Sequence, residues 1–195
     1  MKIIAVISFL AISFLSGCAG TNFVRTSDDQ LIIGKTTEAE LKAKLGAPYR
    51  EGTVTKNDQQ IKTMSYAYAS TSGEAAAPGV TAARSQGYYI FKDVLAGHEF
   101  TSSWKQDSTD FDESKISQIV KGKSTRKDVT ALYGLPNGKY AYPVIPAQGD
   151  EAYVYLYSQT SGSAFSLKFF NKLLVITFGA DGIAKNVEFS SSGQK

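Results

Sequence analysis

The chain has 195 residues, of which 43% are hydrophobic and 12% are aromatic, and this composition is typical of a folded globular protein rather than a disordered chain. Its formal net charge of +3 is small for this length, so it gives no electrostatic case for nucleic-acid binding, which needs Lys and Arg clustered on one face. The only cysteine is Cys18, and the chain has one histidine. These counts exclude an intramolecular disulfide and a Cys/His metal site, and we expect no metal and no cofactor.

The N-terminal residues 1–17 have the features of a signal peptide. Lys2 supplies a positive charge, and the apolar run that follows, residues 3–15, would span only about 20 Å as a helix, against a hydrocarbon core of about 30 Å. The run ends in Leu-Ser-Gly-Cys at residues 15–18, which resembles the lipobox of bacterial lipoproteins, where the thiol accepts a diacylglycerol. The alternative is an ordinary signal peptide with a chance cysteine, but the one cysteine of the chain stands at the position that the lipobox requires.

The resemblance to the lipobox implies that Cys18 becomes the lipidated N-terminus of the mature protein. The next residue is Ala19 and not an aspartate, which implies release to the outer membrane. We therefore expect a lipid-anchored outer-membrane protein that faces the periplasm. Residues 18–30 are polar and predict a tether between the membrane anchor and the folded part.

Two stretches of 18 residues are similar to each other. Residues 31–48 read LIIGKTTEAELKAKLGAP, and residues 119–136 read IVKGKSTRKDVTALYGLP, with six identical positions at a constant offset of 88. Because a repeat of this kind indicates a duplicated structural unit, we predict one unit at residues 31–105 and a second at residues 106–195.

Each copy of the repeat predicts a short helix. The helix can be capped by Thr36 or Thr37 in the first copy and by Ser124 or Thr125 in the second. The apolar residues with the spacing of a buried helical stripe are Leu41, Leu45, Val129, Leu132 and Tyr133. Gly46 and Gly134 stand where a left-handed C-cap is needed, and a proline two residues later prevents continuation. Residues 113–121 predict a further short helix, so that a helix-turn-helix precedes the strands.

After each proline the sequence alternates with a period of two, which predicts β-strands. The strand candidates are residues 64–69, 88–95, 151–158, 173–178 and 183–190. Asp181-Gly182 predicts the last hairpin turn, and residues 96–98 predict another turn that would place His98 on the surface as an ordinary residue. Residues 70–87 predict a long loop, which is either a recognition loop or a tolerated insertion.

Five tyrosines alternate along two of the predicted strands, and we take them as the candidate protein-binding residues: Tyr66, Tyr68, Tyr153, Tyr155 and Tyr157. Two interpretations stay open. If the helices cover the opposite face of the sheet, the tyrosines form an aromatic platform for a protein partner. If the tyrosines face the helices, they belong to the core.

The sequence has no Gly-x-Ser-x-Gly motif, no phosphate-binding loop and no paired-carboxylate signature. We therefore expect no catalytic residues, no enzymatic activity and no small-molecule substrate. The acidic residues between 107 and 113 lack the glycine and the spacing of a calcium loop, and they predict a solvated connector between the two copies.

The order of these motifs resembles the SmpA/OmlA (BamE-like) family of outer-membrane lipoproteins. The matching positions in the second copy are Gly122, Thr125, Val129, Gly134, Pro136, Tyr153, Tyr155, Leu173, Phe178 and Gly182. The doubling resembles the β-lactamase inhibitor protein (BLIP-like) fold, which repeats a similar unit in tandem. The chain departs from both, because the BamE-like proteins have one unit and the inhibitor has disulfides.

These resemblances imply an α+β fold of two tandem units, each a helix-turn-helix followed by an antiparallel sheet, with the strands joined into one twisted sheet or two adjacent ones. They also imply a protein-binding or envelope-assembly module in the outer membrane whose partner is an envelope protein. The alternative is a protein inhibitor of a periplasmic or secreted enzyme that binds its target through the concave sheet.

Overall fold

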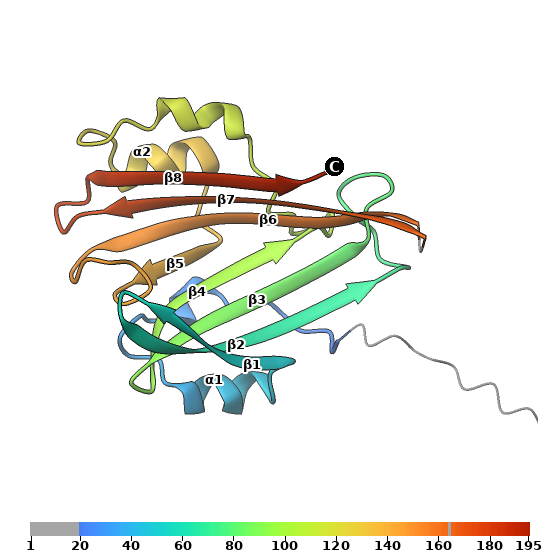
Figure 1. The fold of residues 1–195 in the computed structure, drawn as a ribbon, viewed down its shortest axis with the longest axis horizontal. Helices are drawn as coiled ribbons and strands as arrows, with labels where there is room; N and C mark the ends of the chain where they lie inside the picture. The colour runs from blue at the N-terminus through green and yellow to red at the C-terminus, as the bar shows by residue number, and fades with distance from the viewer. Residues whose placement is uncertain (1–19, 164) are drawn as a thin grey trace, which may run out of the picture.

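The structure, a computed structural model, describes residues 20–163 and 165–195, and its main element is one antiparallel sheet. The strands follow one another in chain order: β1 (Arg50–Lys56), β2 (Gln59–Ser70), β3 (Ala82–Phe91), β4 (Val94–Ser102), β5 (Gly138–Ala141), β6 (Glu151–Ser163), β7 (Ser166–Phe178) and β8 (Ala184–Gly193). The sheet twists and curls into an open curve, as Figure 1 shows. Because every neighbouring pair is antiparallel, short turns and loops suffice to connect most of the strands.

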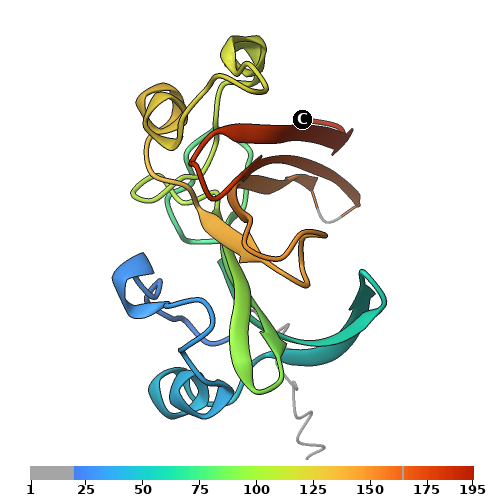
Figure 2. The ribbon, with the colours of Figure 1, turned by 90° about the vertical axis from the view of Figure 1, so that its left-hand side faces the viewer.

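The helical elements are short and lie on the outer side of the curve (Figure 2). They are η1 (Asp28–Gln30), α1 (Glu38–Leu45), η2 (Glu113–Gln118) and α2 (Arg126–Tyr133). The loop from residue 142 to residue 150, between β5 and β6, lies inside the curve. Within the described part of the chain, none of the helices has the length and hydrophobicity needed to cross a membrane.

The expected α+β fold of two tandem units, each a helix-turn-helix followed by an antiparallel sheet, is wrong. The eight strands found in the described residues form one continuous sheet, because β4 pairs with β5 and so satisfies the edges that two separate sheets would leave open. The segment before each α-helix is a 3-10 turn of three or six residues, which is too short to form a helix pair. The protein is therefore mostly an antiparallel sheet with little helix.

Both α-helices begin and end as the sequence predicts. Thr37 caps α1 in a capping box with Glu40, and Thr125 caps α2 in the same way with Asp128. The segments before the helices also attach to the sheet alike, since the Gly34 N–H donates to the Leu95 carbonyl at 2.8 Å and the Gly122 N–H donates to the Ala184 carbonyl at 2.8 Å. The repeated sequence therefore makes the same local structure twice.

The hydrophobic core has three parts, two under the helices and one on the inner face of the sheet. The part under α1 contains Leu41, Met64 and Tyr66, and the part under α2 contains Val129 and Tyr155, each with neighbouring strand residues. The part on the inner face consists of Tyr140, Ile145, Ala152 and Val154, with half-buried neighbours. Both faces of the sheet are thus covered at its centre, which explains why β6 is apolar on both sides.

Part of the segment that was expected to be a tether is instead packed on the sheet. Thr26 is buried, its N–H donates to Gln86 Oε1 at 3.0 Å, and its hydroxyl accepts from the Tyr88 hydroxyl at 3.0 Å. The guanidinium of Arg25 lies 4.9 Å from the centre of the Phe100 ring. These contacts hold the segment before α1 against β3 and β4.

The turns between strands differ in part from those that the sequence indicates. The last hairpin turns at Gly182, with φ of 78°, which confirms the Asp-Gly prediction. The predicted turn at residues 96–98 is wrong, because β3 and β4 are joined earlier in the chain by Lys92 and Asp93, with φ of 51° and 64°. This is the geometry of a tight hairpin turn with two left-handed residues, which lysine adopts rarely. The predicted loop 70–87 shortens to residues 71–81, because β2 and β3 continue into it.

We expect Gly134→Ala to destabilise the protein by about 1–3 kcal/mol, because Gly134 has φ of 76° and ψ of −167°, a conformation essentially restricted to glycine. A Cβ at this position would meet no heavy atom within 4 Å, so the cost is conformational rather than steric. Urea unfolding measures the effect, with Lys127→Ala on the exposed side of α2 as the control. Equal stability of Gly134→Ala and the wild-type protein would contradict the capping role.

Candidate binding cavity on the concave face

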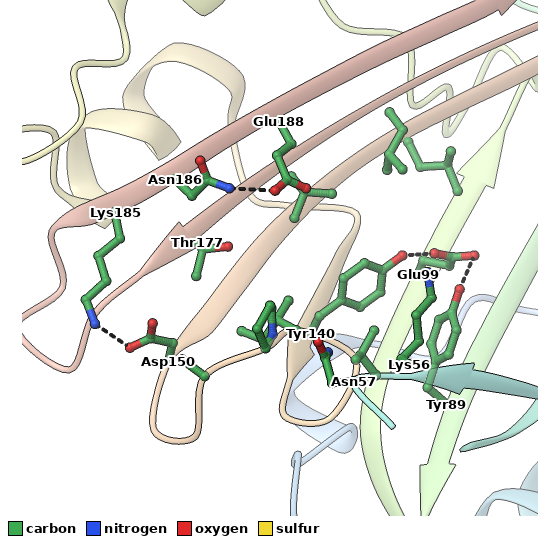
Figure 3. A pocket seen from close by; sticks show the side chains of 17 residues that line it. Lys56, Asn57, Tyr89, Glu99, Tyr140, Asp150, Thr177, Lys185, Asn186 and Glu188 are labelled. Atoms are coloured by element: carbon green, nitrogen blue, oxygen red, sulfur yellow. Dashed lines mark hydrogen bonds and ion pairs between the residues drawn. The ribbon is translucent and has the colours of Figure 1, made fainter. Parts of the chain in front are cut away.

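A cavity of about 660 Å³ lies on the inner face of the sheet. Its volume lies in the range of about 300–1,000 Å³ that is usual for ligand sites. Its walls come from the β1–β2 turn, from β3 to β8, and from the loop 142–150. Asn57 closes one end, because its side-chain amide donates to the Pro143 carbonyl at 2.9 Å. Figure 3 shows the lining side chains.

Apolar side chains form the floor of this cavity. Leu156 on β6 and Leu173 and Val175 on β7 point into it, and Val144 and Ile145 face them from the loop 142–150. The register pairs Leu156 with Leu173 and Val154 with Val175, so successive inner-face positions of two neighbouring strands supply a continuous apolar surface. This surface can bury an aliphatic or aromatic group of a ligand.

A carboxyl group lies beside this apolar floor, between two tyrosines. Glu99 on β4 accepts from the Tyr89 hydroxyl at 3.3 Å through one oxygen and from the Tyr140 hydroxyl through the other (Figure 3). Desolvation raises the pKa of the Glu99 carboxyl, and the hydrogen bonds from Tyr140 and Tyr89 reduce that rise. Desolvation also raises the pKa of both tyrosines, so they stay protonated donors.

The rim of the cavity carries both signs of charge. Lys185 pairs with Asp150 at 2.8 Å, and the Asn186 amide donates to Glu188 at 2.5 Å. Lys56 lines the cavity from the end of β1. An apolar floor, a recessed carboxyl group and a charged rim are the features by which ligand sites combine apolar contact with a few orienting polar groups.

The structure places three of the five candidate tyrosines in the interior, on the helix side of the sheet. Tyr66, Tyr155 and Tyr157 are buried, and the hydroxyls of Tyr66 and Tyr155 donate to the carbonyls of Gly46 and Gly134, each at 2.9 Å. These carbonyls stand at the C-terminal ends of α1 and α2, where the helix itself offers them no N–H donor. Each tyrosine therefore holds a helix end against the sheet. This position supports the interpretation that these residues are core, and it leaves them no surface for a partner.

The remaining two tyrosines are half-buried on the same side. Tyr68 stacks on Trp104 with 6.0 Å between the ring centres, and Tyr153 packs on Phe178 with 4.9 Å between the ring centres. Neither lines the cavity on the concave face. The lipidation candidate Cys18 and the signal peptide lie outside the described residues.

His98 is not the surface residue of a turn that the sequence predicts, and this expectation is wrong. It lies on β4 with 1% of its surface exposed, and neither ring nitrogen has a hydrogen-bond partner among the described residues. Burial lowers its pKa to about 4; nearby Asp28 opposes this effect, whereas Lys139 and Arg25 add to it. His98 points to the helix side, opposite to the neighbouring Glu99, so it takes no part in the cavity.

The residue that sequence reasoning missed is Glu99. Its only sequence signal is its place among the apolar residues of this segment, and that signal does not decide which face of the sheet the side chain takes. The turn expected at residues 96–98 hid this signal, because it placed Glu99 directly after a turn and not in the middle of a strand.

Comparison of the chain with protein-family models, with curated protein sequences and with solved structures finds no match. The resemblance to the SmpA/OmlA family and to the BLIP-like fold therefore stays a prediction from the sequence.

Proposed function

We propose that this protein is a lipid-anchored lipoprotein of the outer membrane that binds an envelope protein through the cavity on its concave face. The observation that carries the proposal is the cavity itself, a hollow of about 660 Å³ with an apolar floor and a charged rim, lying on the face of the sheet that the helices leave free. The lipobox motif at residues 15–18 supports the anchor. The role is binding rather than catalysis.

The geometry favours a protein segment as the ligand. The cavity is open along the inner face of the sheet, and the smaller hollow beside Gly87 shares Tyr89 and Glu99 with it, so the two form a groove. A groove of this kind accommodates an extended segment or a loop whose side chains enter successive hollows. An inhibitor of a periplasmic or secreted enzyme would use the same face, and it differs from an assembly module only in the identity of the protein bound.

Site-specific photo-crosslinking in intact cells tests the proposal. A photoreactive amino acid placed at Asn186 on the rim of the cavity should give an adduct with one envelope protein, whereas the same amino acid at Lys127 on the outer side of α2 should not. The purified partner should then compete with the crosslink and bind the purified lipoprotein. Adducts with that protein only from Lys127, or none from the cavity, would contradict binding through the concave face.

The anchor is tested in the same cells. Cys18→Ala should leave an unprocessed precursor, because the lipid acceptor is lost, while the wild-type protein fractionates with the outer membrane. Normal processing of the Cys18→Ala protein would contradict lipidation at this residue.

A further inference from the structure

We propose that Glu99 is the recognition group of the cavity and that it pairs with a basic side chain, a guanidinium or a primary ammonium, that the partner protein inserts. This inference rests on the proposed function and names the chemistry by which the partner is recognised. It is carried by the access to Glu99, by its free acceptor sites, by the charge of the cavity wall and by the apolar floor.

Access to Glu99 is open because both of its cross-strand neighbours are glycines. Gly87 on β3 and Gly138 on β5 stand directly opposite Glu99 in the register. A Cβ on Gly87 would lie 3.3 Å from Glu99 Cγ, so any larger residue there would cover the carboxyl group. At Gly138 a Cβ would lie 2.2 Å from the His98 carbonyl, so only glycine fits. The sheet thus leaves the carboxyl group approachable from the cavity.

The two tyrosines orient Glu99 without using all of its acceptor sites. A carboxylate offers about four lone-pair sites, and Tyr89 and Tyr140 occupy one on each oxygen. One site on each oxygen remains for a ligand, which is the arrangement that a guanidinium binds through two parallel N–H bonds. An ammonium group can use the same sites as a single charge.

The charged groups of the cavity wall favour a cation. The wall holds three acidic residues, Glu99, Asp150 and Glu188, against two lysines, Lys56 and Lys185, so one negative charge is in excess when all are ionised. Lys185 is paired with Asp150. The charge of Lys56 lowers the Glu99 pKa, but no lysine or arginine of the described chain lies within ion-pair distance of Glu99. A desolvated carboxylate without a paired cation is costly, and a cation from a ligand removes that cost.

The apolar floor suits the stem of the same side chain. Leu156, Leu173 and Val175 line the same cavity as the Glu99 carboxyl group. Lysine and arginine bury their aliphatic stems on apolar surface while the charged end reaches a polar group. The cavity therefore offers contacts both to the aliphatic stem and to the charged end of a basic side chain. A neutral apolar residue or an acidic residue would lack the contact with Glu99.

The test uses n-butylguanidinium as the probe and n-butylurea as its uncharged counterpart, with the purified soluble form of the chain from residue 19 onward. Titrations followed by backbone amide chemical shifts should show that n-butylguanidinium binds at the cavity residues. The dissociation constant of n-butylurea should be at least tenfold higher. Glu99→Gln, which keeps the shape of the side chain, should weaken n-butylguanidinium at least tenfold. Glu113→Gln, an exposed glutamate of η2 outside the cavity, is the matched control and should change its affinity less than threefold.

The affinity of n-butylguanidinium should also fall as the pH is lowered through the titration of Glu99, because the protonated acid no longer attracts the cation. Equal affinities of the two probes for the wild-type protein would overturn the inference, and this comparison needs no variant to fold. Unchanged affinity in Glu99→Gln, or no binding of n-butylguanidinium at all, would overturn it too. If photo-crosslinking finds a partner but n-butylguanidinium does not bind, only the role of Glu99 is refuted. If n-butylguanidinium binds but no partner is found, only the proposed function is refuted.

Discussion

Tyr155→Ala should lower the free energy of unfolding by about 3–5 kcal/mol, the usual cost of truncating a large aromatic residue in a core. Tyr155 is 2% exposed, and its ring lies 5.1 Å from the Tyr133 ring and 6.3 Å from the Phe111 ring, measured between ring centres. Removing the side chain leaves a cavity under α2 and an unpaired carbonyl on Gly134. Urea unfolding followed by circular dichroism measures the change.

The matched control is Tyr155→Phe, which removes only the hydroxyl that bonds to Gly134 and should cost about 1 kcal/mol. The same variant separates the two interpretations of the tyrosines. If Tyr155 belongs to the core, Tyr155→Phe should still bind the partner found by crosslinking. Loss of that partner with unchanged stability would instead support the interpretation that the tyrosines form an aromatic platform. A loss of less than about 1 kcal/mol in Tyr155→Ala would be incompatible with the buried position.

His98 should make the protein lose about 3 kcal/mol of stability between pH 6.5 and pH 4. Burial lowers the His98 pKa from 6.5 to about 4 in the folded state, so in this interval the unfolded chain binds a proton that the folded chain does not. Stability supplied by the neutral ring is therefore fully present above pH 6.5 and is lost as the pH falls towards 4. Among the charged groups that act on the ring, Asp28 raises the His98 pKa, whereas Lys139 and Arg25 lower it.

The measurement is urea unfolding at several pH values for the wild-type protein and for His98→Leu. Other carboxyl groups also titrate below pH 5, so the quantity of interest is the difference between the two proteins at each pH. This difference should favour the variant increasingly as the pH falls from 6.5 to 4. Parallel stability curves would show that His98 is hydrated or paired in solution.

The sequence predicts local structure well because local structure depends on neighbouring residues. Thr37 and Thr125 cap their helices, Gly46 and Gly134 end them with positive φ, and Asp181-Gly182 makes the last turn. Each of these features requires only a few adjacent residues of the right type, so the pattern is sufficient to find it. The alternation of Tyr153, Val154 and Tyr155 is confirmed too, with the tyrosines on the helix side.

The arrangement of these pieces could not be predicted from the sequence in the same way. The turn at Lys92-Asp93 contains no glycine, so the usual sequence signal of such a turn is missing. The pairing of the flanking strands imposes positive φ on Lys92, a conformation that lysine adopts rarely. The joining of the two halves into one sheet depends on the edge of β4, which no local pattern describes. The platform interpretation of the tyrosines required knowledge of which face the helices cover, and that is a tertiary property.

The candidate site escaped prediction for the same reason. Glu99, Tyr89 and Tyr140 lie on three strands and meet only when β3, β4 and β5 are in register. A lone glutamate on an apolar strand is also consistent with an exposed edge, and only the packed loop 142–150 turns its surroundings into a cavity. Motif searches find catalytic signatures, but a recognition site of this kind has no fixed spacing.

The seam between β4 and β5 has a mechanical consequence. These strands pair at only three positions, Gly97 with Tyr140, His98 with Lys139 and Glu99 with Gly138, whereas β6 and β7 pair at 13. Side-chain and loop hydrogen bonds therefore supply much of the connection between the two halves: the Tyr140 hydroxyl donates to Glu99, the Phe100 N–H donates to the Asn137 carbonyl, and the Ser158 N–H donates to the Thr101 hydroxyl. Glu99 and Tyr89 lie on one side of the seam and Tyr140 and Val175 on the other, so the width of the cavity depends on the curvature of the sheet at this place.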